Sequence, residues 1–121
     1  MNKVQLIGRL GKDPKGGVAN GHVYSKFPLA TEDYFYDQQG SKIEKTSWHR
    51  VTLWGKAAEF SNEYLFCGRL VYLEGYIQYR RYTDANGEMR NVTEIVARYV
   101  RALEPRAVHR EHEQYGDLQW G

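Results

Sequence analysis

The chain has 121 residues, 41% hydrophobic and 26% charged, which is typical of one soluble globular domain. Its net charge of +2 is too small to indicate a nucleic-acid ligand by itself, so that inference depends on where the cations lie. The single cysteine excludes an intramolecular disulfide, and no Cys/His cluster has zinc spacing. No apolar run is long enough for a signal peptide or a membrane span. We therefore expect a cytoplasmic protein with no metal, no cofactor and no membrane contact.

The first half of the chain predicts two strands separated by turn-rich sequence. Ten tyrosines and twelve glycines favour strands joined by tight turns. Residues 3–10 and 22–30 alternate as half-buried strands do, and residues 11–21 between them form a turn-rich loop. The polar residues 32–45 predict a long hairpin loop, with strand-like structure confined to its ends.

The second half predicts three strands and one helix. Residues 46–54 alternate strictly, and residues 55–68 have helical spacing with Gly68 as the stop. Residues 69–82 form a long strand in which Gly75 predicts a bend or bulge. A DANG turn separates it from the last strand, residues 90–103.

This order of elements predicts an all-β fold, a five-stranded Greek-key OB-fold barrel with one short helix between strands 3 and 4. The barrel domain occupies residues 1–104. Residues 105–121 are charged and poor in aliphatic side chains, so we expect a short disordered tail there.

The third predicted strand has two chemically different faces. Period-two geometry places Trp48, Arg50 and Trp54 on one face and the aliphatic Val51 and Leu53 on the other. The aliphatic face is the natural core side. The first face then presents two large rings and a cation to solvent.

The fourth predicted strand repeats this pattern. Its apolar face carries Val71, Leu73 and Ile77. Its other face carries Tyr72, Glu74, Tyr76, Gln78, Arg80 and Tyr82. Exposed aromatic rings stack on any nucleobase, and interleaved cations neutralise phosphates, whereas duplex DNA hides its base faces. The two strands therefore predict binding of single-stranded DNA without sequence preference.

The same residues are also consistent with plainer roles. A single aromatic residue on a strand more often belongs to a core or a subunit interface than to a ligand site. Trp48 is therefore also consistent with a buried position at a barrel end, and Tyr72 and Tyr76 with a subunit interface. His49 lies on the core-side face and is expected to be a hydrogen-bonded structural residue. No cluster of residues predicts catalysis.

Several longer segments resemble a known family. They are MNKVQLIGRLGKDP, PLATEDYFYD, TSWHRVTLWGKAAEFSNEYL, VYLEGYIQYRRYTDANGE and NVTEIVA, and together they cover about residues 1–100. These segments resemble bacterial-type single-stranded DNA-binding protein (SSB), a homotetrameric OB-fold family without enzymatic activity. The T-x-W-H-R-V block followed by an aromatic, Gly and Lys is specific to that family.

The resemblance implies roles for individual residues. The four positions implied to stack bases are Phe35, Trp48, Trp54 and Tyr82, with Tyr34 or Tyr36 as alternatives to Phe35 because of a one-residue gap. The positions implied to contact phosphates are Arg50 and Lys56, with Lys3, Arg80 and Arg81 matching by position and charge. His49 lies near the subunit interface in the family, and Tyr72 is a further interface candidate.

The resemblance also implies partners and a setting. It implies a homotetramer that coats single-stranded DNA near the nucleoid during replication, recombination and repair. Family members usually continue to an acidic Pro-Phe tip that recruits replication and repair proteins, but this sequence ends at GDLQWG, as a truncated or a naturally short member would. Recruitment of those proteins is therefore not expected. The alternative function is a dimeric primosome-type adaptor whose aromatic face binds protein.

Overall fold

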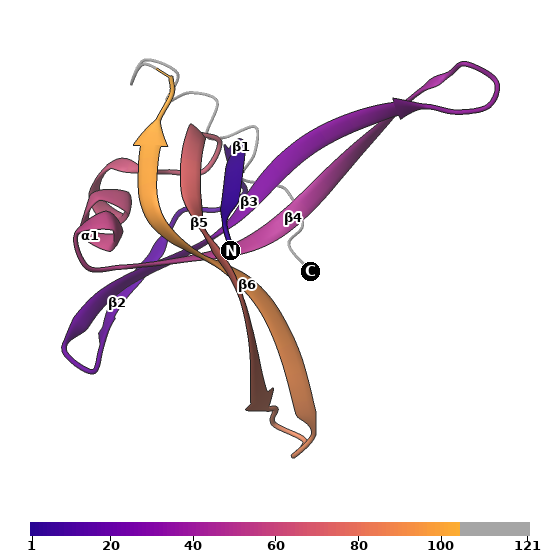
Figure 1. The fold of residues 1–121 in the computed structure, drawn as a ribbon. Coiled ribbons are helices and arrows are strands. Elements are labelled where there is room, and N and C mark those ends of the chain that lie inside the picture. Colours follow the sequence, from indigo (N-terminus) through magenta and orange to yellow (C-terminus); the bar gives the residue numbers. More distant parts are fainter. Residues whose placement is uncertain (105–121) are drawn as a thin grey trace.

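The computed structural model describes residues 1–104 as a strand-rich barrel with one helix (Figure 1). The elements in chain order are β1 (Val4–Leu10), β2 (Lys15–Ala19), β3 (His22–Tyr36), β4 (Lys42–Trp54), α1 (Gly55–Tyr64), β5 (Leu70–Thr83) and β6 (Met89–Ala102). The predicted all-β barrel with a short helix between its third and fourth long strands is confirmed. The predicted tail, residues 105–121, lies outside the described residues.

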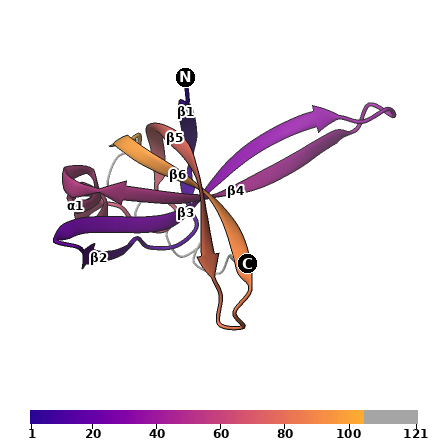
Figure 2. The ribbon, with the colours of Figure 1, turned by 60° about the horizontal axis from the view of Figure 1, so that its bottom comes forward.

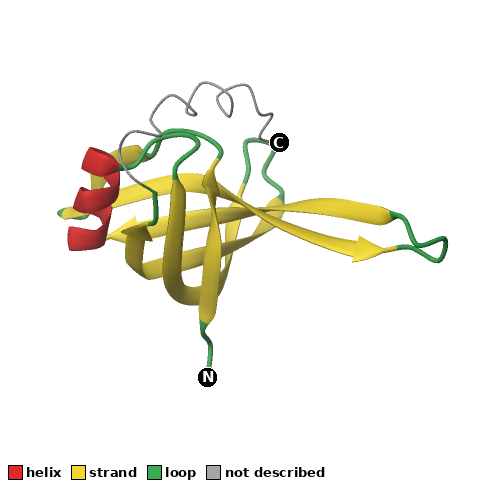
Figure 3. Ribbon diagram, turned by 90° about the horizontal axis from the view of Figure 1, so that it is seen from above, coloured by secondary structure: helices red, strands yellow, loops and turns green. Residues whose placement is uncertain are grey.

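The strands form one sheet that closes on itself. Their order is β1-β5-β6-β4-β3-β2, and an additional pairing between β1 and β3 closes the barrel. Only the β4–β6 contact is parallel among the described pairings; the others are antiparallel. Seen from above, α1 lies beside one end of the barrel (Figure 3). β2 pairs only with β3 and lies outside the closed ring.

Two stretches predicted as loops contain strands. Residues 15–19 form β2, which pairs with the start of β3. Residues 32–36 and 42–46 pair with each other as the outer parts of β3 and β4, so the hairpin loop is much shorter than predicted. The outer parts of β3 and β4 are exposed on both faces, so no alternation of apolar and polar residues marks them as strands. β2 is short and rich in glycine, and none of its residues is fully buried.

Two hairpins project from the barrel as arms (Figures 1 and 2). We define the β3–β4 arm as residues 31–47 and the β5–β6 arm as residues 78–94. Within the described sheet, the outer part of each arm pairs only with itself. The arms therefore extend the barrel surface on two sides.

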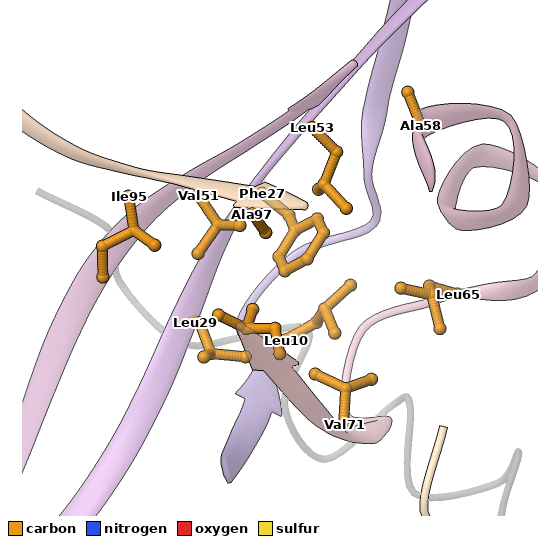
Figure 4. Close-up of a cluster of buried hydrophobic side chains, with 11 residues drawn as sticks. Leu10, Phe27, Leu29, Val51, Leu53, Ala58, Leu65, Val71, Ile95 and Ala97 are labelled. Carbon is orange, nitrogen blue, oxygen red and sulfur yellow. The ribbon is translucent and has the colours of Figure 1, made fainter. Parts of the chain in front are cut away.

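Aliphatic side chains from every strand of the ring fill the barrel. Leu10, Leu29 and Leu53 are completely buried, and Phe27 and Val51 pack beside them (Figure 4). Leu73 of β5 is also completely buried. The α1 helix adds Ala58, and it ends at Tyr64 rather than at Gly68 as predicted, because the next residue is already extended and buries its side chain in the core. Val51 and Leu53 thus lie on the predicted core face.

The predicted irregularity at Gly75 is confirmed. The β5–β6 register shifts between Glu74 and Gly75. A Cβ atom at Gly75 would lie only 2.0 Å from the carbonyl oxygen of Val96, so this position allows the two backbones to approach closely.

No helix of residues 1–104 is long and apolar enough to cross a membrane.

Candidate nucleic-acid interface

The exposed side of β4 continues onto β3. Trp54 pairs with Tyr24, and Arg50 pairs with Pro28. Cross-strand partners in an antiparallel pair point to the same side, so these residues share one surface. Arg50 is exposed and Trp54 is 45% exposed, whereas Val51 on the opposite side is 1% exposed. The predicted separation of Arg50 and Trp54 from the core side of the strand is confirmed, although Thr52 on their side is buried.

The exposed side of β5 joins the same surface through β6. Gln78 pairs with Glu94, and the hydroxyl of Thr52 on β4 donates a hydrogen bond of 3.3 Å to Glu94. Arg80 and Tyr82 follow on the same side of β5, both exposed. We call this continuous surface of β3, β4, β6 and β5 the outer face. It brings the predicted residues of two separate strands together.

Trp54 is part of an aromatic and basic cluster. Its ring lies edge-on to Tyr24, with ring centroids 5.9 Å apart. The ammonium of Lys26 lies 5.3 Å from the centre of the Tyr24 ring. Neither Tyr24 nor Lys26 was predicted as a site residue, although the alternation of residues 22–30 places both opposite the core residue Phe27.

Trp48 is half-buried at the side of the outer face. A Cβ atom at Gly11 would lie 2.4 Å from Cζ3 of the Trp48 ring, so the ring packs directly on the connection between β1 and β2. Pro28 lies beside the same glycine. The ring is thus fixed in place on one side, as expected for either of its predicted roles.

A basic hollow of about 280 Å³ crosses the outer face. We call it the basic groove. Its cationic lining residues are Lys12, Lys15, Lys26, Arg50 and Arg80, and its acidic ones are Asp13 and Glu94. The excess of cations fits a polyanionic ligand. Lys12 and Lys15 were not predicted, because they lie in a turn-rich stretch where no periodicity assigns a face.

The remaining predicted phosphate contacts are more dispersed. Lys3 lies outside the basic groove, in a hollow beside Tyr76 and Arg98, with its ammonium 3.8 Å from Glu74. Lys56 is exposed at the start of α1. Arg81 is exposed but, as the neighbour of Arg80 on a strand, points to the opposite side. Of the predicted cations, the structure brings together Arg50 and Arg80.

The β3–β4 arm carries three exposed aromatic residues. Phe35 lies in β3, paired with Ile43, and is 53% exposed. Strand alternation places Tyr34 and Tyr36 on the other side of the ribbon, where the ammonium of Lys42 lies 4.5 Å from the centre of the Tyr34 ring. Each side of the arm therefore offers at least one ring to a ligand.

The two predicted interface residues are held by local hydrogen bonds. Nε2 of His49 lies 2.8 Å from the hydroxyl of Thr31, and burial lowers the pKa of this imidazole. The Tyr72 hydroxyl donates to Glu74 at 2.8 Å and accepts from Gln5 at 2.9 Å. Neither side chain lines the basic groove.

Within residues 1–104, no group of three or more His, Cys, Asp or Glu side chains could hold a metal ion.

Residues 1–103 match the model of the Single-strand binding protein family. The chain belongs to this family. It is 43% identical over 104 residues to a "Single-stranded DNA-binding protein" of Neisseria meningitidis serogroup A, covering 85% of this chain and 60% of that protein. It is 45% identical over 98 residues to "Single-stranded DNA-binding protein 1" of Chlorobaculum tepidum, covering 79% and 60%. The chain thus spans less than two thirds of the length of these relatives.

Solved structures of the family have the same fold. The structure of the "Plasmodium falciparum SSB complex with ssDNA" superposes with a TM-score of 0.80 at 31% identity, covering 86% of this chain and 96% of that one. A deletion mutant of the single-stranded DNA binding protein from Thermus aquaticus superposes with a TM-score of 0.78 at 32% identity, covering 88% and 52%. The OB-type barrel is therefore the fold of this family member.

Proposed function

We propose that this chain binds single-stranded DNA with little dependence on base sequence and without catalysis. One observation carries the proposal: the outer face places aromatic rings beside a groove lined by five cations and two carboxylates. Rings bind the faces of unpaired bases, and cations bind the phosphates that connect them. Family membership and the DNA-bound relative from Plasmodium falciparum support the same ligand.

Different residues of the outer face would bind the base and the phosphate of each nucleotide. Trp54 is exposed at one end of β4, and Tyr82 is exposed on the β5–β6 arm, so each can receive a base. Arg50 and Arg80 lie in the groove beside them and would meet the backbone. Neither kind of contact reads the hydrogen-bonding edge of a base, which accounts for the lack of sequence preference.

A fluorescence titration tests this function. Stacking on Trp48 or Trp54 should quench tryptophan emission when oligo(dT) is added, with little response to duplex DNA of the same length. Raising the salt concentration should weaken the complex, because phosphate contacts release counterions. Equal quenching by duplex DNA would contradict the proposal.

Phe35 is proposed as a further stacking residue from its match to the family. The comparison of Phe35→Ala with Tyr34→Ala and Tyr36→Ala tests this choice, because Phe35 and the two tyrosines lie on opposite sides of the arm. A greater loss of oligo(dT) affinity for Phe35→Ala is expected. A greater loss for either tyrosine variant would move the stacking platform to the other side.

We also propose the homotetramer, with His49 and Tyr72 near its interfaces. On the side of β1 that faces β3, only Arg9 and Leu10 are paired, so residues 4–8 present a free strand edge within the described chain. Ile7 on that segment is 57% exposed. An exposed strand edge with apolar side chains is a template for pairing with another chain. Native mass spectrometry should show four chains, with and without oligo(dT); a monomer would overturn this proposal.

The biological setting is proposed from family membership alone. The protein would be cytoplasmic and associated with the nucleoid. It would coat single-stranded DNA during replication, recombination and repair by binding it on the outer face. The adaptor alternative predicts a stable dimer with weak affinity for oligo(dT), so the two measurements above distinguish it from the tetrameric single-strand binder.

A further inference from the structure

A nearly buried carboxylate lies in the wall of the basic groove, where repulsion of DNA would be expected. The Glu94 side chain is 9% exposed. It accepts hydrogen bonds from Gln78 at 3.0 Å, from Arg80 at 3.0 Å and from Thr52 at 3.3 Å. Three donors from β4 and β5 thus satisfy both oxygens, so the charge is tolerated where it is.

The bond to Arg80 has a particular geometry. It uses the Nε–H of the guanidinium and accepts it on Oε1 of Glu94, while the Arg80 side chain remains 44% exposed and lines the groove. A guanidinium carries its other N–H donors on the two terminal nitrogens, in the planar fork that matches a phosphate. The contact with Glu94 therefore orients the group and leaves the fork open.

We propose that Glu94 is a positioning residue that holds Arg80 ready for a phosphate of single-stranded DNA. This inference rests on the function proposed above. An arginine has a long flexible side chain, and immobilising such a side chain on binding weakens affinity. Glu94 orders Arg80 before the strand arrives. The backbone phosphate then meets an oriented donor rather than a mobile one.

The negative charge of Glu94 acts in the opposite direction, so a simple deletion would mix two effects. Two substitutions of similar volume separate them. Glu94→Gln removes the charge but keeps an oxygen that accepts from Arg80 and Gln78, and its amide can donate to Thr52. Glu94→Met removes the charge together with the acceptor oxygens. The ratio of their affinities therefore reports the loss of the acceptor oxygens at equal charge, and its dependence on Arg80 isolates positioning.

The experiment titrates both variants with oligo(dT) at fixed salt, in the wild-type and in the Arg80→Ala background. Glu94→Met should bind about two- to ten-fold more weakly than Glu94→Gln, the cost of ordering one long side chain. In the Arg80→Ala background the two should bind equally. Glu94→Leu serves as a second acceptor-free variant if Glu94→Met does not fold, and Glu59→Gln on exposed α1 controls for the change in net charge.

Each result has a distinct meaning. Equal affinities of the Gln and Met variants in the wild-type background would overturn the inference, because Glu94 would then act only through its charge. A difference that persists without Arg80 would also overturn it, since the effect would be structural. If the wild-type chain itself fails to bind oligo(dT), the proposed function fails instead, and that outcome is seen before any variant is compared.

Discussion

Trp48 and Trp54 occupy the same side of β4 but have different surroundings. The Trp48 ring packs on the β1–β2 connection at Gly11, whereas Trp54 is 45% exposed and touches Tyr24 edge-on. A ring that is already packed on one side contributes to stability as well as to binding. An exposed ring contributes mainly to binding. Alanine substitutions of the two tryptophans should therefore have different effects on stability and on DNA affinity.

Trp54→Ala should lower the affinity for oligo(dT) by about 1–3 kcal/mol, the value of one base–aromatic stack. Its thermal midpoint should stay close to that of the wild type, because little buried surface is lost. Trp48→Ala should lower both quantities. Filter binding and thermal unfolding measure them without using tryptophan emission. Trp54→Phe keeps a stacking ring and is the matched control, and unchanged affinity in Trp54→Ala would show that this ring is structural.

The two arms end in the same turn. In each, an aspartate side chain accepts hydrogen bonds from backbone N–H groups two and four residues later: Asp37 from Gln39 and Ser41, and Asp84 from Asn86 and Glu88. A glycine with positive φ completes each turn, +83° at Gly40 and +79° at Gly87. This shared D-x-x-G pattern sets the registers of both arms.

Gly40→Ala should loosen the β3–β4 arm without unfolding the barrel. The left-handed conformation costs a residue with a Cβ atom about 1–2 kcal/mol, and no other atom lies within 4 Å to add a clash. Since the arm pairs mainly with itself, the cost should appear as faster amide exchange in residues 31–47. Gly87→Ala is the matched variant and should act on residues 78–94. Uniformly faster exchange throughout the chain would contradict this separation.

The arms also show where sequence patterns stop being informative. Strand faces were predictable where one side contacts the core, as for Val51 against Arg50 and Trp54. Phe35 lies in a ribbon with solvent on both sides, so its face could not be derived from alternation and its strand was mistaken for a loop. The same holds for β2, which lies outside the closed ring.

The groove shows a second limit of the sequence. Arg50 and Arg80 were predicted from their own strands, but Lys12 and Lys15 join them through contacts between segments. Lys12 lies in the connection that follows β1 where β1 closes against β3, and Lys15 begins β2, where it pairs with Lys26 of β3. Glu94 gave no signal either, because a single acidic residue in a strand does not reveal which donors surround it. Contacts between distant segments depend on the closed topology, which spacing along the chain does not encode.

At the scale of the whole molecule, the last described residue ties the barrel together. The carboxylate of Glu104 accepts two hydrogen bonds from Arg9, at 2.6 and 3.0 Å, and one from the backbone N–H of Leu70 at 3.2 Å. Its own carbonyl accepts from Arg69 at 3.1 Å. These bonds connect β1, the start of β5 and the end of β6. A bidentate pair of this kind is stronger than an ordinary surface ion pair.

This contact should make part of the stability depend on pH. The hydrogen bonds from Arg9 hold the pKa of Glu104 below its ordinary value of 4.5. A carboxyl whose pKa is depressed on folding stabilises the native state above its unfolded pKa, and this contribution disappears as the pH falls through the folded pKa. Glu104→Gln should therefore lower the thermal midpoint at pH 7, and the difference from wild type should shrink below about pH 4.5.

The expected size is about 1 kcal/mol at neutral pH, or roughly 4–8 °C in the midpoint for a domain of this size. Thermal unfolding followed by circular dichroism from pH 3 to pH 7 measures it. Glu59→Gln on the exposed side of α1 changes the net charge equally and should show no comparable pH-dependent difference. A difference between Glu104→Gln and wild type that stays constant down to pH 3 would mean that packing of the side chain, and not its charge, holds the barrel ends together.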